Sequence, residues 1–333
     1  MESNFEKLNI PIHITGFQIA AKVKLPLKLY WIILTPITLF KILRILKRTN
    51  PNVVITSLYQ SDILGILAAK LMGISNRIFI QHDVVSLSWL QKSVKKIICT
   101  RWATKVIAVS NPVKEYITKE FKIPSTRIVV INNGIDTELL KEGKRMMSGQ
   151  PVIGMVGRLE SVKGPDVLLK ALNILKKKHN IEPAVVLGGG GSMYSSLESY
   201  AHEHQLRKVN FLGPVAHPLE VLKQVDVLVI PSLSEGFGLV ALEGLVAGKA
   251  VIASDFPALR ELIHHKKNGL LFPVGDYERL ANIIYELSTN KSFLEDIQNG
   301  VQDWIISEGK KFDINNTALA YQNIFLSDIS AKS

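Results

Sequence analysis

Short apolar runs that alternate with helical patterns constrain the fold of this chain more than any other feature. Ten such runs recur, and most are apolar throughout, as expected for strands that helices cover on both faces. Strands alternating with helices at this spacing predict parallel sheets. The predicted fold class is therefore α/β, with two doubly wound sheets. The predicted strands are Val53–Thr56, Arg77–Ile80, Lys105–Val109, Ile128–Ile131, Val152–Val156, Ala184–Leu187, Val209–Leu212, Asp226–Ile230, Ala250–Ala253 and Leu270–Phe272.

Basic residues are concentrated in the first part of the chain. Residues 1–145 carry 22 Lys and Arg against 9 Asp and Glu, a net charge of +13, whereas residues 146–333 carry 18 against 20, a net charge of −2. Halves with such different surfaces are expected to be domains with different partners. We place one domain at 1–145, a second at 146–310, and over 311–333 a helix that packs back towards the first domain. The polar stretch 136–150 is the predicted boundary.

Cysteine use and hydropathy indicate a cytoplasmic protein. A single cysteine, Cys99, forms no internal disulfide and builds no cysteine-rich zinc site, so a reducing compartment is expected. Residues Met1–Leu8 lack the apolar core of a secretory signal. The most apolar run, Leu29–Phe40, contains Pro36 and is shorter than the ~20 residues that span a bilayer. We expect no transmembrane helix.

The segment Lys22–Arg48 has seven basic and no acidic residues, with Tyr30, Trp31 and Phe40 among them. Cations interleaved with aromatic rings suit an anionic membrane surface, which predicts peripheral docking on the inner face of the cell membrane. The alternative is an ordinary amphipathic helix whose lysine stems extend over a core. No nucleic-acid-binding signature accompanies the basic residues, so nucleic acid is not an expected partner.

A glycine-containing turn follows the predicted strand Asp226–Ile230 and precedes a predicted helix. The free N–H groups at such a helix start bind anions, and Gly236 and Gly238 let the backbone approach a phosphate or a sugar. Glu243, among small and apolar neighbours inside the helix, is placed to bind a diol such as ribose, and Glu235 a group beyond the phosphates. Otherwise Glu235 is a surface loop residue and Glu243 a solvated helix residue.

A second strand-loop-helix segment contains Arg158 and Lys163, which leave the same strand end and are predicted to converge on one diphosphate. Pro165 after Gly164 is suited to the first turn of a helix. Isolated basic loop residues are usually solvated, and that alternative applies here. Gly188–Gly191, after another predicted strand, is a weaker signal of close backbone approach.

Together these segments resemble the family 4 glycosyltransferases, retaining enzymes of the GT-B fold, over about Asn9 to Phe325. Glu235 and Glu243, with seven residues between them, look like the paired glutamates of that family. The resemblance implies two doubly wound domains facing a cleft, with the acceptor on the first and a nucleotide diphosphate sugar on the second. Its implied donor-binding residues are Arg158 and Lys163 for the diphosphate, Glu243 for the ribose, Glu235 for the donor sugar, and Gly236, Phe237 and Gly238 in the turn.

The resemblance extends to the first domain through His82, which follows the predicted strand Arg77–Ile80 and resembles the histidine that lines the family's cleft near the donor sugar. By itself, a lone histidine after a strand is more often structural. Ser110–Pro112 looks like the family's serine-containing loop, Asn133–Asp136 like the end of its first domain, and Phe211–Gly213 like its nucleobase-side loop. The resemblance implies catalytic roles for His82 and Glu235.

The start of the chain departs from the family pattern. Asn9–Thr15 looks like the family's second strand, so one strand-loop-helix unit of about 30 residues is expected to be missing. The absent strand is central in a doubly wound sheet, so its loss is expected to impair folding and transfer.

These observations predict an enzyme that transfers a sugar with retention from a nucleotide diphosphate sugar to a glycan or lipid-linked acceptor, in cell-surface polysaccharide or glycolipid synthesis. No cofactor and no obligatory metal are expected, and no Asp-x-Asp motif is present. Two alternatives remain open: a truncated or degenerate homologue that binds nucleotide sugar without efficient turnover, and a GT-B-fold nucleotide-sugar epimerase.

Overall fold

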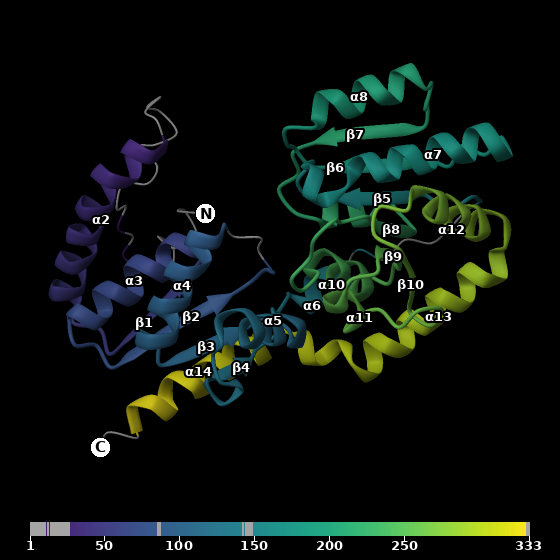
Figure 1. The fold of residues 1–333 in the computed structure, drawn as a ribbon. Helices are drawn as coiled ribbons and strands as arrows, with labels where there is room; N and C mark the ends of the chain where they lie inside the picture. The colour runs from purple at the N-terminus through teal and green to yellow at the C-terminus, as the bar shows by residue number, and fades with distance from the viewer. Residues whose placement is uncertain are drawn as a thin grey trace. The chain divides into compact units, whose positions relative to one another are not determined.

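The computed structural model describes residues 11, 13, 27–84, 88–141, 143 and 149–330 (Figure 1). The predicted early strand Asn9–Thr15 and the basic residues Lys22 and Lys24 lie largely outside this part of the chain. The chain forms two compact units. Unit 1 contains residues 1–108, 114–130 and 325–333, and unit 2 contains residues 109–113 and 131–324.

Unit 1 is built on a parallel sheet whose four strands follow one another in chain order. Its strands are β1 (Val53–Ser57), β2 (Asn76–Gln81), β3 (Lys105–Ala108) and β4 (Ile128–Val130). They match the first four predicted strands to within one or two residues. Among the residues that the structure describes, β1 pairs with β2 alone, so its other edge has no described strand neighbour.

Three long helices pack in unit 1: α2 (Leu27–Thr49), α3 (Tyr59–Leu71) and α4 (Trp89–Trp102). Helix α2 contacts α3 through a cluster that includes Leu46, Ala68 and Ala69, and α3 contacts α4. Ser88 begins α4 with a capping box, in which its hydroxyl accepts from the Gln91 N–H while the Gln91 side chain accepts from the Ser88 N–H. The shorter helices are α5 (Asn111–Tyr116), η2 (Ile117–Phe121) and η3 (Ser125–Arg127).

Unit 2 contains six parallel strands in the order β10-β9-β8-β5-β6-β7, the arrangement of a doubly wound sheet. After β5 the chain adds β6 and β7 on one side of β5, and it then crosses to add β8 on the other side. The switch point therefore lies between β5 and β8. Ligands bind such sheets beyond the carboxyl ends of the strands at that point. The strands are β5 (Ile153–Val156), β6 (Val185–Gly188), β7 (Val209–Gly213), β8 (Val227–Ile230), β9 (Ala250–Ser254) and β10 (Gly269–Phe272). All ten predicted strands are therefore confirmed.

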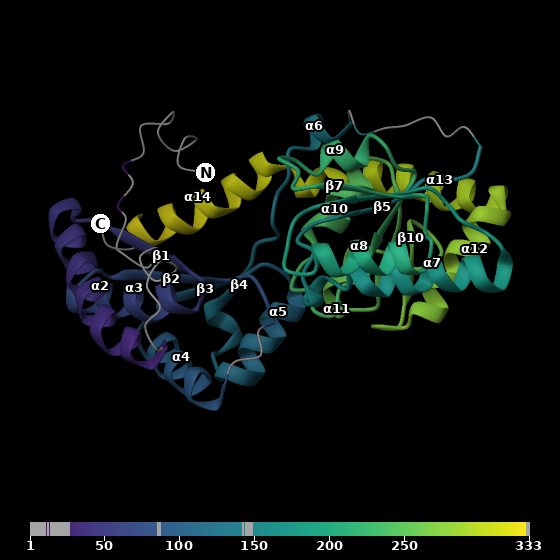
Figure 2. The same ribbon diagram turned by 90° about the horizontal axis from the view of Figure 1, so that it is seen from above.

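Helices cover both faces of the unit 2 sheet. Figure 2 shows α7 (Pro165–His179) and α8 (Tyr194–Glu203) on one face and α9 (Leu219–Leu222) on the other. The core joins Leu168 and Leu172 of α7 to Leu187 of β6 and Ile252 of β9, all almost fully buried. The remaining helices are α6 (Thr137–Lys141), η4 (Ser161–Lys163), α10 (Leu239–Val246), α11 (Pro257–Arg260), α12 (Tyr277–Thr289), α13 (Lys291–Ser307), η5 (Gly309–Phe312) and α14 (Ile314–Ser330).

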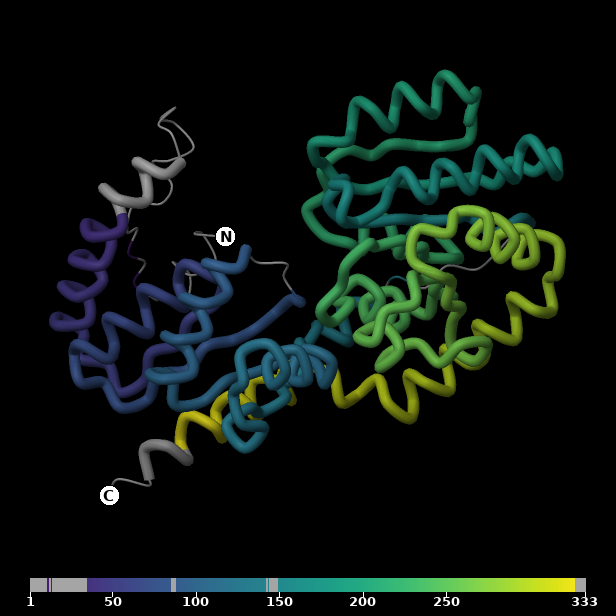
Figure 3. Tube along the Cα trace, in the orientation of Figure 1, coloured from purple at the N-terminus to yellow at the C-terminus, as the bar shows by residue number. Residues whose placement is uncertain are grey.

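The start of α14 is fixed within unit 2 by residues that follow β4 (Figure 3). Thr317 donates its hydroxyl to the Asn132 carbonyl at 3.1 Å, and the backbone N–H of Ile135 donates to Phe312 at 2.9 Å. A Cβ on Gly134 would lie 2.5 Å from the Thr317 hydroxyl, which explains the glycine at this contact. In the part of the chain that the structure describes, no helix combines the length and the apolar character needed to cross a membrane.

Candidate functional site

The carboxyl ends of β5 and β8 bring together the two glycine-containing segments that the sequence singled out. Gly164 lies in the left-handed region with φ +63°, and a Cβ there would lie 2.1 Å from the carbonyl oxygen of Pro231. Glycine is thus required both for the backbone angle and for the close approach. The Leu233 N–H donates to the Val162 carbonyl at 2.8 Å, which ties the loop after β8 to the loop after β5.

Lys163 and Glu235 form an ion pair across these loops. The Lys163 Nζ lies 2.8 Å from Glu235 Oε2, and the Ser232 hydroxyl donates to the same oxygen at 3.3 Å. The side chains are 29% and 12% exposed, so the pair is partly screened from water. Sequence reasoning assigned these residues to different parts of one ligand and did not predict that they contact each other.

Glu243 is a buried carboxylic acid, one of whose oxygens has no hydrogen-bond partner among the described residues. It lies in α10, as predicted, and is only 9% exposed. Its Oε2 has no hydrogen-bond partner among the described residues, and burial raises the pKa of this carboxyl from 4.5 to about 7. Buried polar groups in folded proteins are nearly always hydrogen-bonded, and this oxygen is an exception. A bound ligand that donates a hydrogen bond to Oε2 would remove the exception. The prediction that its apolar neighbours bury Glu243 is confirmed.

The turn before α10 is held from two sides. The hydroxyl of Ser110 donates to the Gly236 carbonyl at 2.7 Å. The buried ring of Phe237 lies 6.1 Å from that of Phe312, and Phe312 in turn stacks on Trp304 at 5.9 Å. Gly238 begins α10 with φ +92°, where only glycine is unstrained. The free N–H groups at the start of α10 are therefore presented by a rigid turn.

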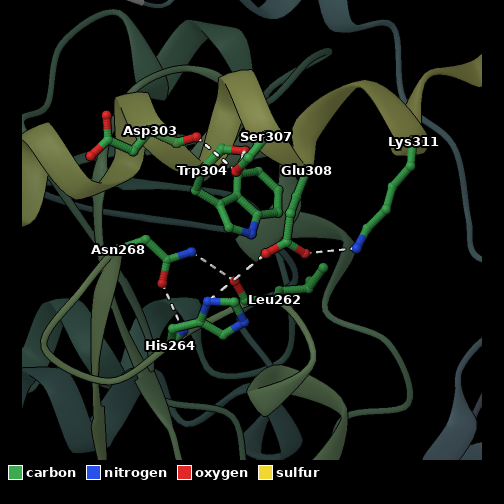
Figure 4. Close-up of polar contacts among 8 residues, drawn as sticks. All are labelled: Leu262, His264, Asn268, Asp303, Trp304, Ser307, Glu308 and Lys311. Carbon is green, nitrogen blue, oxygen red and sulfur yellow. Dashed lines mark hydrogen bonds and ion pairs between the residues drawn. The ribbon is translucent and has the colours of Figure 1, made fainter.

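Polar contacts around Trp304 join the end of α13 to the loop after α11 (Figure 4). The Glu308 carboxylate lies 2.7 Å from Lys311 Nζ and 4.0 Å from His264 Nδ1. The Asn268 side chain accepts from the His264 N–H at 2.6 Å and donates to the Leu262 carbonyl at 2.8 Å. These contacts hold the segment that carries Phe312, and through Phe312 they support Phe237.

Arg158 extends from the loop after β5 and is exposed. The neighbouring Glu160 accepts from the Ser192 N–H and hydroxyl, which lowers the pKa of Glu160, and the charge of Arg158 acts in the same direction. A Cβ on Gly189 would lie 1.8 Å from the Gly157 carbonyl oxygen, so glycine is required here for packing against the loop after β5, and the predicted approach of Gly188–Gly191 to a ligand stays a prediction. The Arg158 side chain is thus exposed, while the backbone at its base packs closely against Gly189.

His82 follows the last residue of β2 in unit 1 and is half-buried. It borders a small cavity that Tyr59, Gln81 and Lys95 also line. Gln81 and Lys95 belong to a buried polar network with Asp62 that the sequence did not single out as functional. In the described ranges, no group of three His, Cys, Asp or Glu side chains is arranged to hold a metal ion.

Two family models match the chain. The model of the glycosyl transferases group 1 matches residues 136–304, and the model of glycosyltransferase family 4 matches residues 13–139. An uncharacterized glycosyltransferase of Methanocaldococcus jannaschii is 31% identical over 236 residues, which are 66% of this chain and 59% of that protein. The chain thus spans less than two thirds of that relative.

An Escherichia coli relative named UDP-Gal:alpha-D-GlcNAc-diphosphoundecaprenol alpha-1,3-galactosyltransferase is 29% identical over 76% of this chain and 70% of its own length. Among solved structures, Anabaena HepE in complex with UDP-glucose matches with a TM-score of 0.81 at 21% identity, over 98% of this chain and 88% of that one. A glycosyltransferase from Rickettsia africae gives 0.76 at 22% identity, over 98% and 87%. These structures share the GT-B fold with this chain. The family matches, the fold and the paired glutamates agree, and the chain belongs to the family 4 glycosyltransferases, with a group 1 glycosyl transferase domain in its C-terminal half.

Proposed function

We propose that this protein transfers a sugar from a nucleotide diphosphate sugar, with retention, to a glycan or lipid-linked acceptor in cell-surface polysaccharide or glycolipid synthesis. The observation that carries the proposal is Glu243, a buried carboxyl in the helix that follows β8, one oxygen of which has no hydrogen-bond partner among the described residues. A vicinal diol such as that of ribose supplies hydroxyl donors for such an oxygen. A buried carboxylate that lacks hydrogen-bond donors has lost its hydration and destabilises the folded protein. The two hydroxyls of a diol replace the lost hydrogen bonds from water.

The cationic groups of the loop that follows β5 fit a diphosphate. We assign Lys163 and Arg158 to the diphosphate oxygens, together with the free N–H groups that Gly236, Phe237 and Gly238 present at the start of α10. Positive groups at this position stabilise the leaving nucleoside diphosphate as the glycosidic bond breaks. Because these groups already supply positive charge, we propose that the reaction needs no obligatory metal.

Glu235 and His82 are the proposed catalytic residues. Glu235 is ion-paired with Lys163, so a diphosphate bound to Lys163 frees the carboxylate of Glu235 to accept hydrogen bonds from the hydroxyls of the donor sugar. His82 stays the proposed residue of unit 1 for the transfer step, on the family resemblance and on its position after β2.

Two relatives support the donor and acceptor classes. The E. coli relative carries a name that specifies a UDP-sugar donor and a lipid diphosphate acceptor, and Anabaena HepE was solved with UDP-glucose. We therefore propose a UDP-sugar as the first donor to test and a polyprenyl-linked glycan as the first acceptor.

The surface of α2 supports docking on an anionic membrane. Ile37 and Phe40 are 46% and 65% exposed on this helix, and the exposed cations Lys41, Arg44 and Arg48 lie on its second half. Apolar side chains beside cations are typical of helices that lie in the membrane interface. We propose that unit 1 docks on the inner face of the cell membrane through α2.

Calorimetry with UDP- and GDP-sugars tests the donor site. We expect Lys163→Ala and Glu243→Gln each to weaken binding of the preferred nucleotide sugar by about 1.5 to 3 kcal/mol, the usual loss for a hydrogen bond to a charged group. Lys170→Ala is the matched control, because Lys170 pairs with Asp166 at 2.8 Å on the same segment but on its exposed side. Unchanged affinity of the first two variants would refute the donor-site assignment.

Release of the nucleoside diphosphate distinguishes the proposed function from its alternatives. The preferred donor is incubated with the protein and with vesicles of bacterial total lipid extract. Two products are then quantified: the sugar incorporated into lipid and the nucleoside diphosphate released into solution. A transferase produces both in equal amounts. A degenerate homologue binds the donor and releases neither, whereas an epimerase converts the donor to an isomer without release. The anomeric configuration of the product tests retention.

A further inference from the structure

Unit 1 contains a buried ion pair that the proposed chemistry does not use. Asp62 lies in the first turn of α3 and Lys95 in the middle of α4, and they are 0% and 3% exposed. The Lys95 Nζ donates to Asp62 Oδ2 at 2.6 Å. Asp62 is fully buried and Lys95 nearly so, and Lys95 reaches the small cavity that His82 borders, so the pair is placed to act on the reaction through the residues around that cavity.

The pair has further hydrogen-bond partners. The Thr56 hydroxyl donates to Asp62 Oδ1 at 2.9 Å, and Lys95 Nζ also donates to Gln81 Oε1 at 2.8 Å. The ammonium lies over the ring of Phe79 at 5.4 Å. Burial raises the pKa of Asp62, and the charge of Lys95 opposes that shift. The network is thus polar, connected and buried.

Stability alone is a weak explanation for such a network. Replacing a buried ion pair with apolar residues of similar size is often neutral or stabilising, because both charges lose their hydration on burial. A fully connected polar network, in contrast, fixes the relative positions of the groups that it joins. The question is therefore which group is being fixed.

Gln81 connects the ion pair to the turn that carries His82. It is the last residue of β2, and while its Oε1 accepts from Lys95, its Nε2 donates to the carbonyl of Asp83 at 2.6 Å. The side chain therefore spans His82 and joins the residues before and after it. His82 lines the same small cavity as Gln81 and Lys95, so it lies beside the network.

We propose that Lys95 is a positioning residue for His82. With Asp62 as its counterion, Lys95 holds the Gln81 amide, and the amide holds the Asp83 carbonyl, so the turn keeps His82 in one orientation. The proposal rests on the proposed function of His82 in transfer. The neighbouring Cys99 is buried, and the pKa of its thiol is raised to about 12, so the thiol remains protonated and takes no part as a nucleophile.

Two variants interrupt the contacts from Lys95 through Gln81 to Asp83 without leaving an isolated buried charge. The first is the pair Asp62→Leu with Lys95→Met, which replaces both charges by apolar groups. The second is Gln81→Met, which keeps the ion pair and removes the clamp. Lys92→Met is the matched control, because Lys92 is on the same helix and pairs with Glu120 at the surface.

Because a displacement of about 1 Å at a reacting group can cost 100-fold in rate, we expect both variants to lower the kcat of transfer between about 10- and 100-fold. We expect the calorimetric Kd of the donor to change less than about twofold, since the network lies in unit 1. Amide hydrogen exchange at residues 82–84 should accelerate in both variants and stay unchanged in Lys92→Met.

A double-mutant cycle with His82→Ala separates positioning from a general structural role. If Lys95 acts through His82, the same variants lower transfer by less than about twofold when His82 is already alanine. Equal losses in both backgrounds, or loss of the fold in both network variants, overturn the proposal. If His82→Ala by itself leaves transfer unchanged, the proposed function of His82 fails first, and the two failures are thereby distinguished.

Discussion

Replacing Glu243 with glutamine should stabilise the protein without ligand while impairing the donor site. Burial raises the pKa of this carboxyl from 4.5 to about 7, so folding favours its protonated form. The stability that it contributes is complete below pH 4.5 and is lost as the pH rises to about 7, because the unfolded chain releases the proton first. The two pKa values correspond to a loss of about 3 kcal/mol, at about 1.4 kcal/mol for each pH unit.

The assay is urea unfolding of the wild type and of Glu243→Gln at intervals between pH 4.5 and pH 8. Other carboxylates titrate in both proteins, so the difference between the two free energies of unfolding isolates Glu243. We expect the variant to gain about 3 kcal/mol over the wild type across this interval and to gain nothing further above pH 8. A difference that does not change with pH would refute the reasoning, because it would mean that Glu243 has the same pKa in the folded protein as in the unfolded chain.

Three further predictions follow from the same structure. The affinity of the preferred nucleotide sugar should rise with pH towards 7 in the wild type and not in Glu243→Gln, since hydroxyl donors favour the carboxylate; calorimetry in buffers of different ionisation enthalpy should detect the released proton. Gly164→Ala should lose roughly 1 to 3 kcal/mol more stability than Gly213→Ala in urea unfolding, because both glycines have positive φ but only Gly164 has a carbonyl oxygen within reach of the new Cβ; equal losses would contradict the contact. Binding to vesicles should rise with their anionic lipid content, fall with salt, and be weakened by Lys41→Glu with Arg44→Glu; equal binding to neutral and anionic vesicles would exclude the electrostatic contribution.

The sequence predicted those features that depend on local pattern. The ten strands are short apolar runs, and burial on both faces of a parallel sheet requires such runs, so their bounds were found to within one or two residues. Gly164 with Pro165 marked the start of α7 because proline fixes the backbone angle of a first helical turn. The burial of Glu243 could be predicted because its neighbours Leu242, Gly244 and Leu245 are small or apolar.

The contacts that were missed depend on the order of the strands and on buried charge. Lys163 and Glu235 are 72 residues apart and meet only because β5 lies next to β8, which no local pattern specifies. Lys95 contributed to the sequence analysis only through the net charge of residues 1–145, because lysine is almost never fully buried unless it is paired, and no local pattern marks its partner. Its counterion Asp62 comes from another helix, 33 residues away.

The ion pair of Lys163 and Glu235 sets two requirements for a ligand that binds between them. A ligand that enters must give Lys163 a new anion and give Glu235 new hydrogen-bond donors, or one of the two charges stays uncompensated in a partly buried place. An intact sugar diphosphate satisfies both conditions, whereas a free nucleoside diphosphate satisfies only the first. In the proposed reaction the sugar hydroxyls leave with the acceptor after transfer, and Glu235 then competes with the diphosphate for Lys163. Re-forming the ion pair would therefore help to expel the product, and turnover would be faster than the affinity for the diphosphate alone implies.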